Sequence, residues 1–254
     1  VSTEMRKAIY SEKADNISIA NNSIFGEFGA SAIQTGIELN GSDVVNNVDI
    51  RSNGMWNLQF GILAHRVDQA IIEHNALYAN EAIMGIASNA SRNVTVSENT
   101  LIGGNASGQH STTGIELYNV NDAEPNMRFS CNHIDGFDKG IDLNVKKVEV
   151  HSLSNNELKG YATGINVTLP SGTFYMGDYY TPSNNRYLST ESGHKDIVMN
   201  GGGATYLYAY NSVNGNGFYP GDLDYSGGYV LPYQTWATNW MCTFPLPPAQ
   251  QESN

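Results

Sequence analysis

The chain has 254 residues, of which 40% are hydrophobic and 15% charged, and its formal net charge is −12. A surface this acidic repels nucleic acid and anionic membranes, so neither is expected as a partner. It also repels polyanionic glycans unless a cation or a basic patch intervenes. No apolar run approaches the about 18 residues of a membrane span. Sustained helical periodicity is missing too, so short strands and turns are expected.

The first fifteen residues contain no apolar segment of the kind found in signal peptides. Ala8-Ile9 resembles a degenerate copy of the repeat described next, so the chain is expected to open partway through a repeat. The free end of a repeat protein exposes an unpaired strand edge and is normally capped. We therefore expect further protein, upstream in the same chain or from another chain, to cover this end.

A Gly-Ile dipeptide then recurs along the chain at intervals of 24 to 29 residues. Because one such repeat cannot bury its apolar face alone, the repeats are expected to stack about 4.8 Å apart around a continuous apolar column. The glycine is expected to let the chain enter each strand through a tight bend. The six copies begin at Gly36, Gly61, Gly85, Gly114, Gly140 and Gly164.

A second pattern, apolar-any-apolar-any-any-Asn, recurs between the Gly-Ile pairs. Its alternating apolar residues predict short strands with one face inward. We expect the asparagine to end each strand in a turn and to adopt the left-handed backbone conformation there. Stacked on its neighbours, it is also expected to form an amide ladder. The six asparagines are Asn22, Asn53, Asn75, Asn99, Asn132 and Asn156.

The two patterns in fixed order resemble the short repeats of the right-handed parallel β-helix family, the pectin-lyase-like superfamily. The resemblance covers roughly residues 16–174. It implies an all-β fold, a right-handed parallel β-helix of about seven to nine coils, with residues 1–174 forming the regular coils. Another β-solenoid, or a β-sandwich with coincidental spacing, is the alternative.

Two repeats carry longer segments between the asparagine and the next Gly-Ile, at residues 23–35 and 100–113. Insertions in solenoids bulge from one face and often line a binding surface. Neutral loop drift explains them equally well, because lengthening a loop costs little stability.

The outward positions that follow each Gly-Ile suggest a site in the later repeats. Side chains alternate along a strand, so stacking is expected to place Glu116 beside Asp142 and Tyr118 beside Asn144. His110 lies in the preceding insertion. Two adjacent carboxylates either raise one pKa or recruit a cation. An acid–base pair, a calcium site and a solvated polar ladder are the three interpretations.

Glu38 follows the first Gly-Ile pair and is the first residue of the same outward column. In the next repeat the column position is Leu63, and His65 lies two residues after it. Glu38 and His65 are candidate binding residues. His65 belongs to a mixed-charge stretch with Arg66 and Asp68, which ordinary surface ion pairs also explain.

Enzymes of the pectin-lyase-like family act on glycans through carboxylates on such an outer sheet, sometimes with calcium and sometimes with an Arg or Lys base. The resemblance implies that possibility for Glu116 and Asp142. The chain lacks the Asp-Pro-His motif of the alginate epimerases and the paired aspartates of polygalacturonases. The family's catalytic residues therefore cannot be assigned to positions of this chain.

After Phe174 the period fades, and eleven of the fifteen tyrosines lie from Tyr175 onward. Residues 175–240 are expected to form irregular final coils or a small capping β-module, with residues 241–254 as a Pro-rich tail. Cys131 and Cys242 either form a disulfide, or Cys131 is a small apolar side chain near the core.

These observations favour a secreted or cell-surface β-helix module of a larger protein, with a structural or adhesive role and a polar face for glycans or partner proteins. The alternative is a polysaccharide lyase, glycoside hydrolase or epimerase centred on Glu116 and Asp142. A third possibility is a phage tailspike-like fibre, which would be a trimer.

Overall fold

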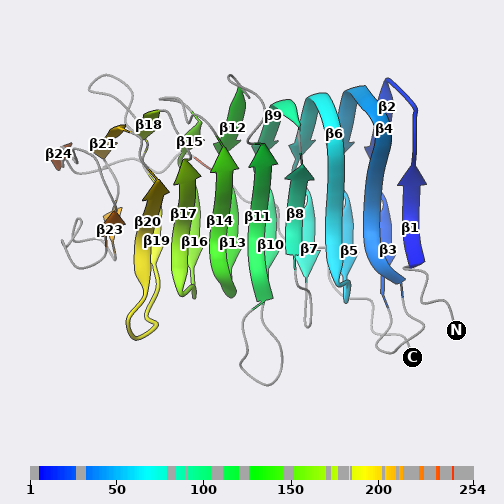
Figure 1. Cartoon of the computed structure of the whole chain (residues 1–254). Coiled ribbons are helices and arrows are strands. Elements are labelled where there is room, and N and C mark those ends of the chain that lie inside the picture. Colours follow the sequence, from blue (N-terminus) through cyan, green and yellow to red (C-terminus); the bar gives the residue numbers. More distant parts are fainter. Residues whose placement is uncertain are drawn as a thin grey trace, which may run out of the picture.

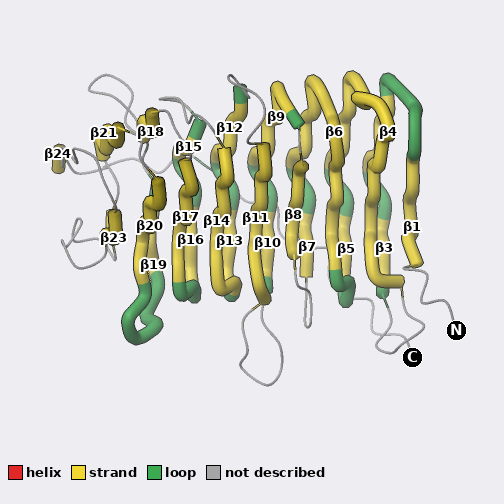
Figure 2. Tube along the Cα trace, in the orientation of Figure 1, coloured by secondary structure: helices red, strands yellow, loops and turns green. Residues whose placement is uncertain are grey.

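The computed structural model describes residues 6–26, 33–78, 84–89, 91–103, 111–119, 126–145, 152–169, 173–176, 183, 185–201, 204–209, 212–213, 223–225, 233–234 and 242. Figure 2 shows that the elements within these ranges are strands joined by turns, and none is a helix. Accordingly, the described part of the chain contains no helix that is long and apolar enough to cross a membrane. The protein is therefore all-β, as the sequence predicts.

A first set of strands carries the Gly-Ile pairs and the positions equivalent to them. Its members follow one another in chain order along the front of Figure 1. They are β1 (Arg6–Ser11), β4 (Ile33–Arg51), β6 (Phe60–Glu73), β8 (Met84–Asn89), β11 (Ser111–Asn119), β14 (Phe137–Val145), β17 (Thr163–Leu169), β20 (Lys195–Gly201) and β23 (Leu223–Tyr225).

A second set carries the apolar pairs that precede the ladder asparagines. It consists of β2 (Ile17–Ala20), the later halves of β4 and β6, β9 (Arg92–Ser97), β12 (Met127–Ser130) and β15 (Leu153–Ser154). Because β4 and β6 run through both sets, the two sets form one thirteen-stranded sheet among the described residues.

A third set follows the asparagines and forms an eight-stranded sheet. It consists of β3 (Ser23–Phe25), β5 (Gly54–Trp56), β7 (Ala76–Tyr78), β10 (Thr100–Ile102), β13 (His133–Asp135), β16 (Glu157–Lys159), β19 (Arg186–Leu188) and β22 (Ser212–Val213). A small sheet of β18 (Thr173–Met176), β21 (Ala204–Ala209) and β24 (Tyr233–Gln234) lies beside the late strands.

Strands pair in parallel with the equivalent strand of the next repeat, not with their neighbours in sequence. For example, β11 pairs with β8 and β14, and β13 pairs with β10 and β16. The repeats consequently lie side by side as a stack that is compatible with a β-helix (Figure 1). The parallel pairing aligns the same position of successive repeats in straight columns.

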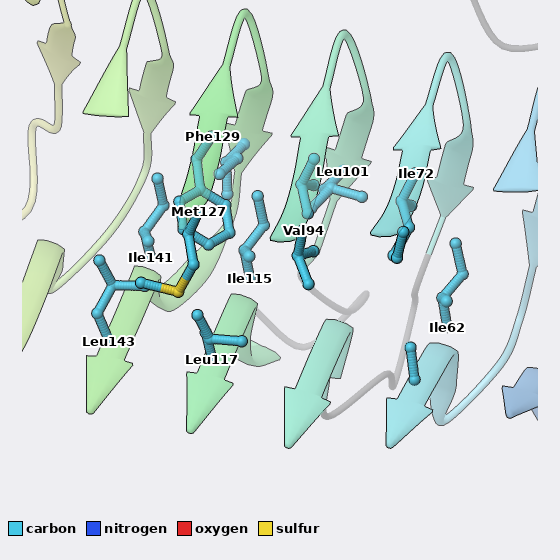
Figure 3. Packing of buried hydrophobic residues seen from close by; sticks show 14 of the residues in the cluster. Ile62, Ile72, Val94, Leu101, Ile115, Leu117, Met127, Phe129, Ile141 and Leu143 are labelled. Atoms are coloured by element: carbon cyan, nitrogen blue, oxygen red, sulfur yellow. The ribbon is translucent and has the colours of Figure 1, made fainter. Parts of the chain in front are cut away.

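The interior of the stack is a continuous apolar column (Figure 3). Ile62, Ile115 and Ile141 from the Gly-Ile pairs are at most 1% exposed, and Ile72 and Phe129 of the second set face the same interior. Burying one side chain of this size contributes about 1.5–3 kcal/mol. Repetition of such residues in three strand sets is what holds the stack together.

The glycine of the Gly-Ile pair has a different role from the one expected. Gly114, Gly140 and Gly164 lie within strands and not at a bend before them, and none has a positive φ. A methyl group on Gly140 would lie 2.3 Å from Leu158 Cδ2 and 2.6 Å from the carbonyl oxygen of Gly164. Glycine is required here because the core and the next strand approach its backbone closely.

The expected amide ladder is confirmed. Each ladder asparagine donates its side-chain Nδ2 to Oδ1 of the next one at 2.9–3.1 Å. From Asn53 onward, Nδ2 also donates to a carbonyl oxygen of an earlier repeat, as Asn99 does to Ile72 at 2.9 Å. The ladder extends one step beyond the predicted copies, from Asn156 to Asn185, and both of these side chains are fully buried.

The left-handed conformation belongs to the residue before each ladder asparagine, which corrects the expectation. Its φ lies between 54° and 59°, and the ladder asparagines themselves have no positive φ. The turn therefore bends one residue earlier and leaves the asparagine side chain free to point inward. The residues concerned are Asn21, Ser52, His74, Glu98, Cys131 and Asn155.

Four of the described strands beyond Phe174, β19, β20, β22 and β23, continue the same columns, whereas β21 and β24 belong to the small separate sheet. Ile197 pairs with Ile165, and Tyr187 pairs with Leu158. Asp196 takes the position of the column glycine, and its fully buried carboxylate accepts a hydrogen bond from the Tyr161 hydroxyl. The division predicted at residue 174 stays a prediction.

Cys131 and Cys242 form a disulfide that joins residues 111 positions apart. Of the two interpretations left open by the sequence, the structure therefore has the bonded one. Cys242 Sγ also lies 3.7 Å from the carbonyl oxygen of Asn155, at the turn of the following repeat. The rest of the Pro-rich segment 241–254 is outside the described residues.

Candidate functional site

The strands β11, β14 and β17 bring the outward residues of three repeats together. Glu116 lies opposite Asp142, and Tyr118 lies opposite Asn144. On the far side of β14, Asn166 continues the column of the two carboxylates. The inward neighbours of these residues are fully buried, so the alternation of a strand fixes the outward direction of the polar set.

A surface pocket of about 210 Å³ lies over these three strands. Apart from the buried Leu117 and the more exposed Tyr118, its lining residues are polar and half-buried. The lining residues include Glu116, Tyr118, Lys139, Asp142, Asn144 and Thr168. This pocket contains four of the residues that the sequence singled out.

Asp142 accepts hydrogen bonds from two other residues of the pocket. The Lys139 ammonium forms an ion pair with its Oδ2, and Asn166 Nδ2 donates to its Oδ1 at 2.7 Å. Both carboxylate oxygens therefore have a donor from the chain itself.

Glu116 has the opposite environment. Burial raises the pKa of Glu116, the neighbouring Asp142 raises it further, and Lys139 partly offsets this. The two carboxylates thus differ, with Asp142 paired to a cation and Glu116 favouring its protonated form more than usual. Burial is the larger cause of the raised pKa of Glu116 and Asp142 the smaller one, so the acid–base, calcium and polar-ladder interpretations of the two carboxylates stay predictions.

Lys139 bears directly on the possible calcium ion. A calcium ion bound to Asp142 would have to displace the ammonium group that already neutralises this carboxylate. Among the residues that the structure describes, no group of three or more His, Cys, Asp or Glu side chains could hold a metal ion.

The other two candidate residues lie at the N-terminal part of the same outward column. Glu38 is buried and forms an ion pair with Lys7 at 2.7 Å. His65 lies opposite Asn40, and burial lowers the pKa of His65, opposed by Glu38 and assisted by Lys7. Three strand spacings, about 14 Å, separate Glu38 from Glu116, so these residues are not part of the pocket.

His110 lies outside the described residues, as do the central parts of both insertions, residues 27–32 and 104–110. Lys139 is the pocket residue that sequence reasoning missed. It precedes Asp142 by three residues, and this short separation is the only signal in the sequence that could have pointed to the pair.

The chain was compared with protein-family models, with curated proteins and with solved structures, and none of them matches. The pocket must therefore be interpreted from its own chemistry.

Proposed function

We propose that the chain is an extracellular module that binds a glycan on the outward face of its Gly-Ile strands. In this proposal it is a right-handed parallel β-helix of about seven to nine coils, similar in plan to the pectin-lyase-like family, within a larger surface protein. The observation that carries the proposal is the pocket over β11, β14 and β17.

The pocket combines the two features that sugar rings require of a protein surface. Tyr118 is 44% exposed, so its ring offers a flat apolar face on which a sugar can stack. Carboxylate and amide groups at Glu116, Asp142 and Asn144 surround it and can bond hydroxyl groups. A small polar pocket fits one or two sugar rings. A partner protein would instead require a broad surface with an apolar centre.

Two further observations support an extracellular location. Disulfides persist in oxidising environments and are rare in the cytosol, and the chain has one between Cys131 and Cys242. The low proportion of charged residues and the acidic balance agree with export.

The test is a glycan array on the purified chain, with and without calcium, comparing the native protein with Tyr118→Ala. Tyr10→Ala is the matched control, because Tyr10 is an equally exposed tyrosine on the same face, outside the pocket. We expect Tyr118→Ala to lose about 1–3 kcal/mol of binding free energy and Tyr10→Ala to bind as the native chain does. Binding of no glycan, or equal loss in both variants, would contradict the proposal.

A second candidate function, cleavage or epimerisation of a polysaccharide, is favoured by the contrast between the two carboxylates. A general acid needs a carboxyl group whose pKa is raised, beside a second carboxylate that acts as a base or nucleophile. Glu116 has a raised pKa, whereas Asp142 is held by a cation and an amide.

This candidate is tested by product analysis of every glycan that binds. If the chain is an enzyme, Glu116→Gln abolishes turnover while the variant still folds and unfolds in a cooperative thermal transition. Full activity in that variant would eliminate this site, and binding without new reducing ends or unsaturated uronates would leave the binding function alone.

A further inference from the structure

The hydrogen-bonding capacity of the pocket is unevenly distributed. Two donors among its described residues, the Lys139 ammonium and Asn166 Nδ2, are both directed to Asp142. The carboxylate of Glu116 has no hydrogen bond among the described residues. Oδ1 of Asn144 is buried and has no partner there either.

The Asn144 amide and the hydroxyl groups of Tyr118 and Thr168 also line the pocket, and these groups can donate as well as accept. What distinguishes the pocket is its acceptors without partners, at Glu116 and Asn144 Oδ1. A buried acceptor without a partner costs about 1–3 kcal/mol, which a ligand that donates to it recovers. With Glu116 and Asp142 ionised and Lys139 as the one described cation of the lining, the charge of the pocket is also negative. The pocket consequently favours a ligand that brings positive charge and several N–H or O–H donors.

The same outward column already binds an ammonium group elsewhere in this chain. Glu38 occupies the slot of Glu116, three strands earlier in register. There Lys7 Nζ lies 2.7 Å from the Glu38 carboxylate and 4.0 Å from the centre of the Tyr10 ring. Tyr10 lies opposite Glu38 on the neighbouring strand, whereas Tyr118 lies two residues beyond Glu116 on the same strand, so the carboxylate slot is what the two places share. At Glu38 this slot binds an ammonium group that the chain itself supplies.

Resting on the proposed glycan binding, we propose that the pocket selects amino sugars, whose ammonium group binds to acceptors supplied by Glu116 and Asn144, and that it rejects uronic acids. An ammonium group provides three donors and a positive charge, so it satisfies both acceptors and the negative field. An N-acetylated sugar keeps one amide donor but loses the charge. A uronate brings a further negative charge, and its hydroxyl groups donate hydrogen bonds without the positive charge that would offset Glu116 and Asp142.

The pH dependence follows from the same groups. Raising the pH through the elevated pKa of Glu116 ionises its carboxylate and strengthens the attraction for an ammonium group. Asp142 facing it from β14 and Lys139 beside Asp142 are the other charged groups of the lining. Affinity for an amino sugar is therefore expected to rise from acid pH until the sugar's own amine begins to lose its proton.

The experiment measures dissociation constants by calorimetry for trimers of glucosamine, N-acetylglucosamine and galacturonic acid at about pH 6, where free amines are protonated. We expect the glucosamine trimer to bind about tenfold or more tightly than the galacturonate trimer. In Glu116→Gln its advantage over the N-acetylated trimer should fall about tenfold. Asp138→Asn is the matched control, because it removes one exposed carboxylate of β14 that lies outside the pocket.

The possible results distinguish a failure of the amino-sugar preference from a failure of the proposed glycan binding. Tighter binding of the galacturonate trimer, or an unchanged preference in Glu116→Gln, would overturn the amino-sugar specificity and leave glycan binding intact. Binding of none of the three trimers, nor of any glycan on the array, would overturn the proposed function and the specificity with it. Thermal unfolding of each variant verifies that the stack is intact.

Discussion

Two columns of polar side chains run along this stack, and they differ in how completely they are hydrogen-bonded. In the ladder from Asn53 to Asn185 each side chain is at most 1% exposed and bonds both a neighbouring asparagine and the backbone. In the outward column, Glu116 and Asn144 have acceptors without partners among the described residues. A repeated polar residue is therefore structural where its bonds are complete, and available to a ligand where they are not.

The sharpest test of this difference replaces one asparagine in each column. Asn99→Ala removes the donor to Asn132 and to Ile72. It also leaves the Asn75 amide without the acceptor that Asn99 provides. We expect a loss of about 3 kcal/mol in the free energy of unfolding, because buried polar groups lose their partners. Urea denaturation measures it.

Asn144→Ala is the counterpart in the outward column, and its effect should stay within about 0.5 kcal/mol. The residue is half-buried and its Oδ1 has no partner to lose. Equal destabilisation by Asn99→Ala and Asn144→Ala would mean that the two columns do not differ in this way.

The boundary between the inner and outer faces can be tested at the Gly-Ile pair. In Gly140→Ala the new methyl group meets Leu158 and the backbone of Gly164 at less than 3 Å. We expect a loss of about 2 kcal/mol from overpacking, measured as a lowered urea midpoint. Asp138→Ala, two residues earlier on the exposed face of the same strand, should change stability by less than about 0.5 kcal/mol. A neutral Gly140→Ala would show that the glycine serves chain flexibility instead.

The smallest effect concerns a carboxylate that is paired on the outer face. The His133 hydrogen bond lowers the pKa of Glu157, and Arg186 and Lys159 add to this against the effect of burial. A lowered pKa gives stability that is present above the ordinary glutamate pKa and is lost as the pH falls through the lowered value. We expect Glu157→Gln to remove about 1 kcal/mol at neutral pH and little at acid pH.

The contribution of Glu116 to the free energy of unfolding is expected to depend on pH in the opposite direction. Its pKa is raised, so its contribution is present below the ordinary glutamate pKa and is lost as the pH rises through the raised value. Unfolding curves of Glu157→Gln and Glu116→Gln over a series of pH values should therefore diverge in opposite directions from the native protein. Parallel curves would contradict the distinction between the paired and the unpaired carboxylate.

The amino-acid sequence by itself determined the repeats, the inward columns and the adjacency of Glu116 and Asp142. In parallel strands whose side chains alternate, a fixed position in each repeat defines its neighbours once the strands stack in register. The Gly-Ile and asparagine spacings carry that register, so local spacing was sufficient for the columns and for four of the pocket residues.

Only the tertiary structure decided which partners these residues have. The ion pair of Lys139 with Asp142 depends on the reach of a flexible side chain, and the separation of Glu38 from the pocket depends on the strands between them. The continuation of the ladder to Asn185 and the disulfide to Cys242 join segments whose intervening lengths vary. Spacing fixes which positions align, whereas hydrogen bonds, charge pairing and burial are set by what the folded chain brings to each position.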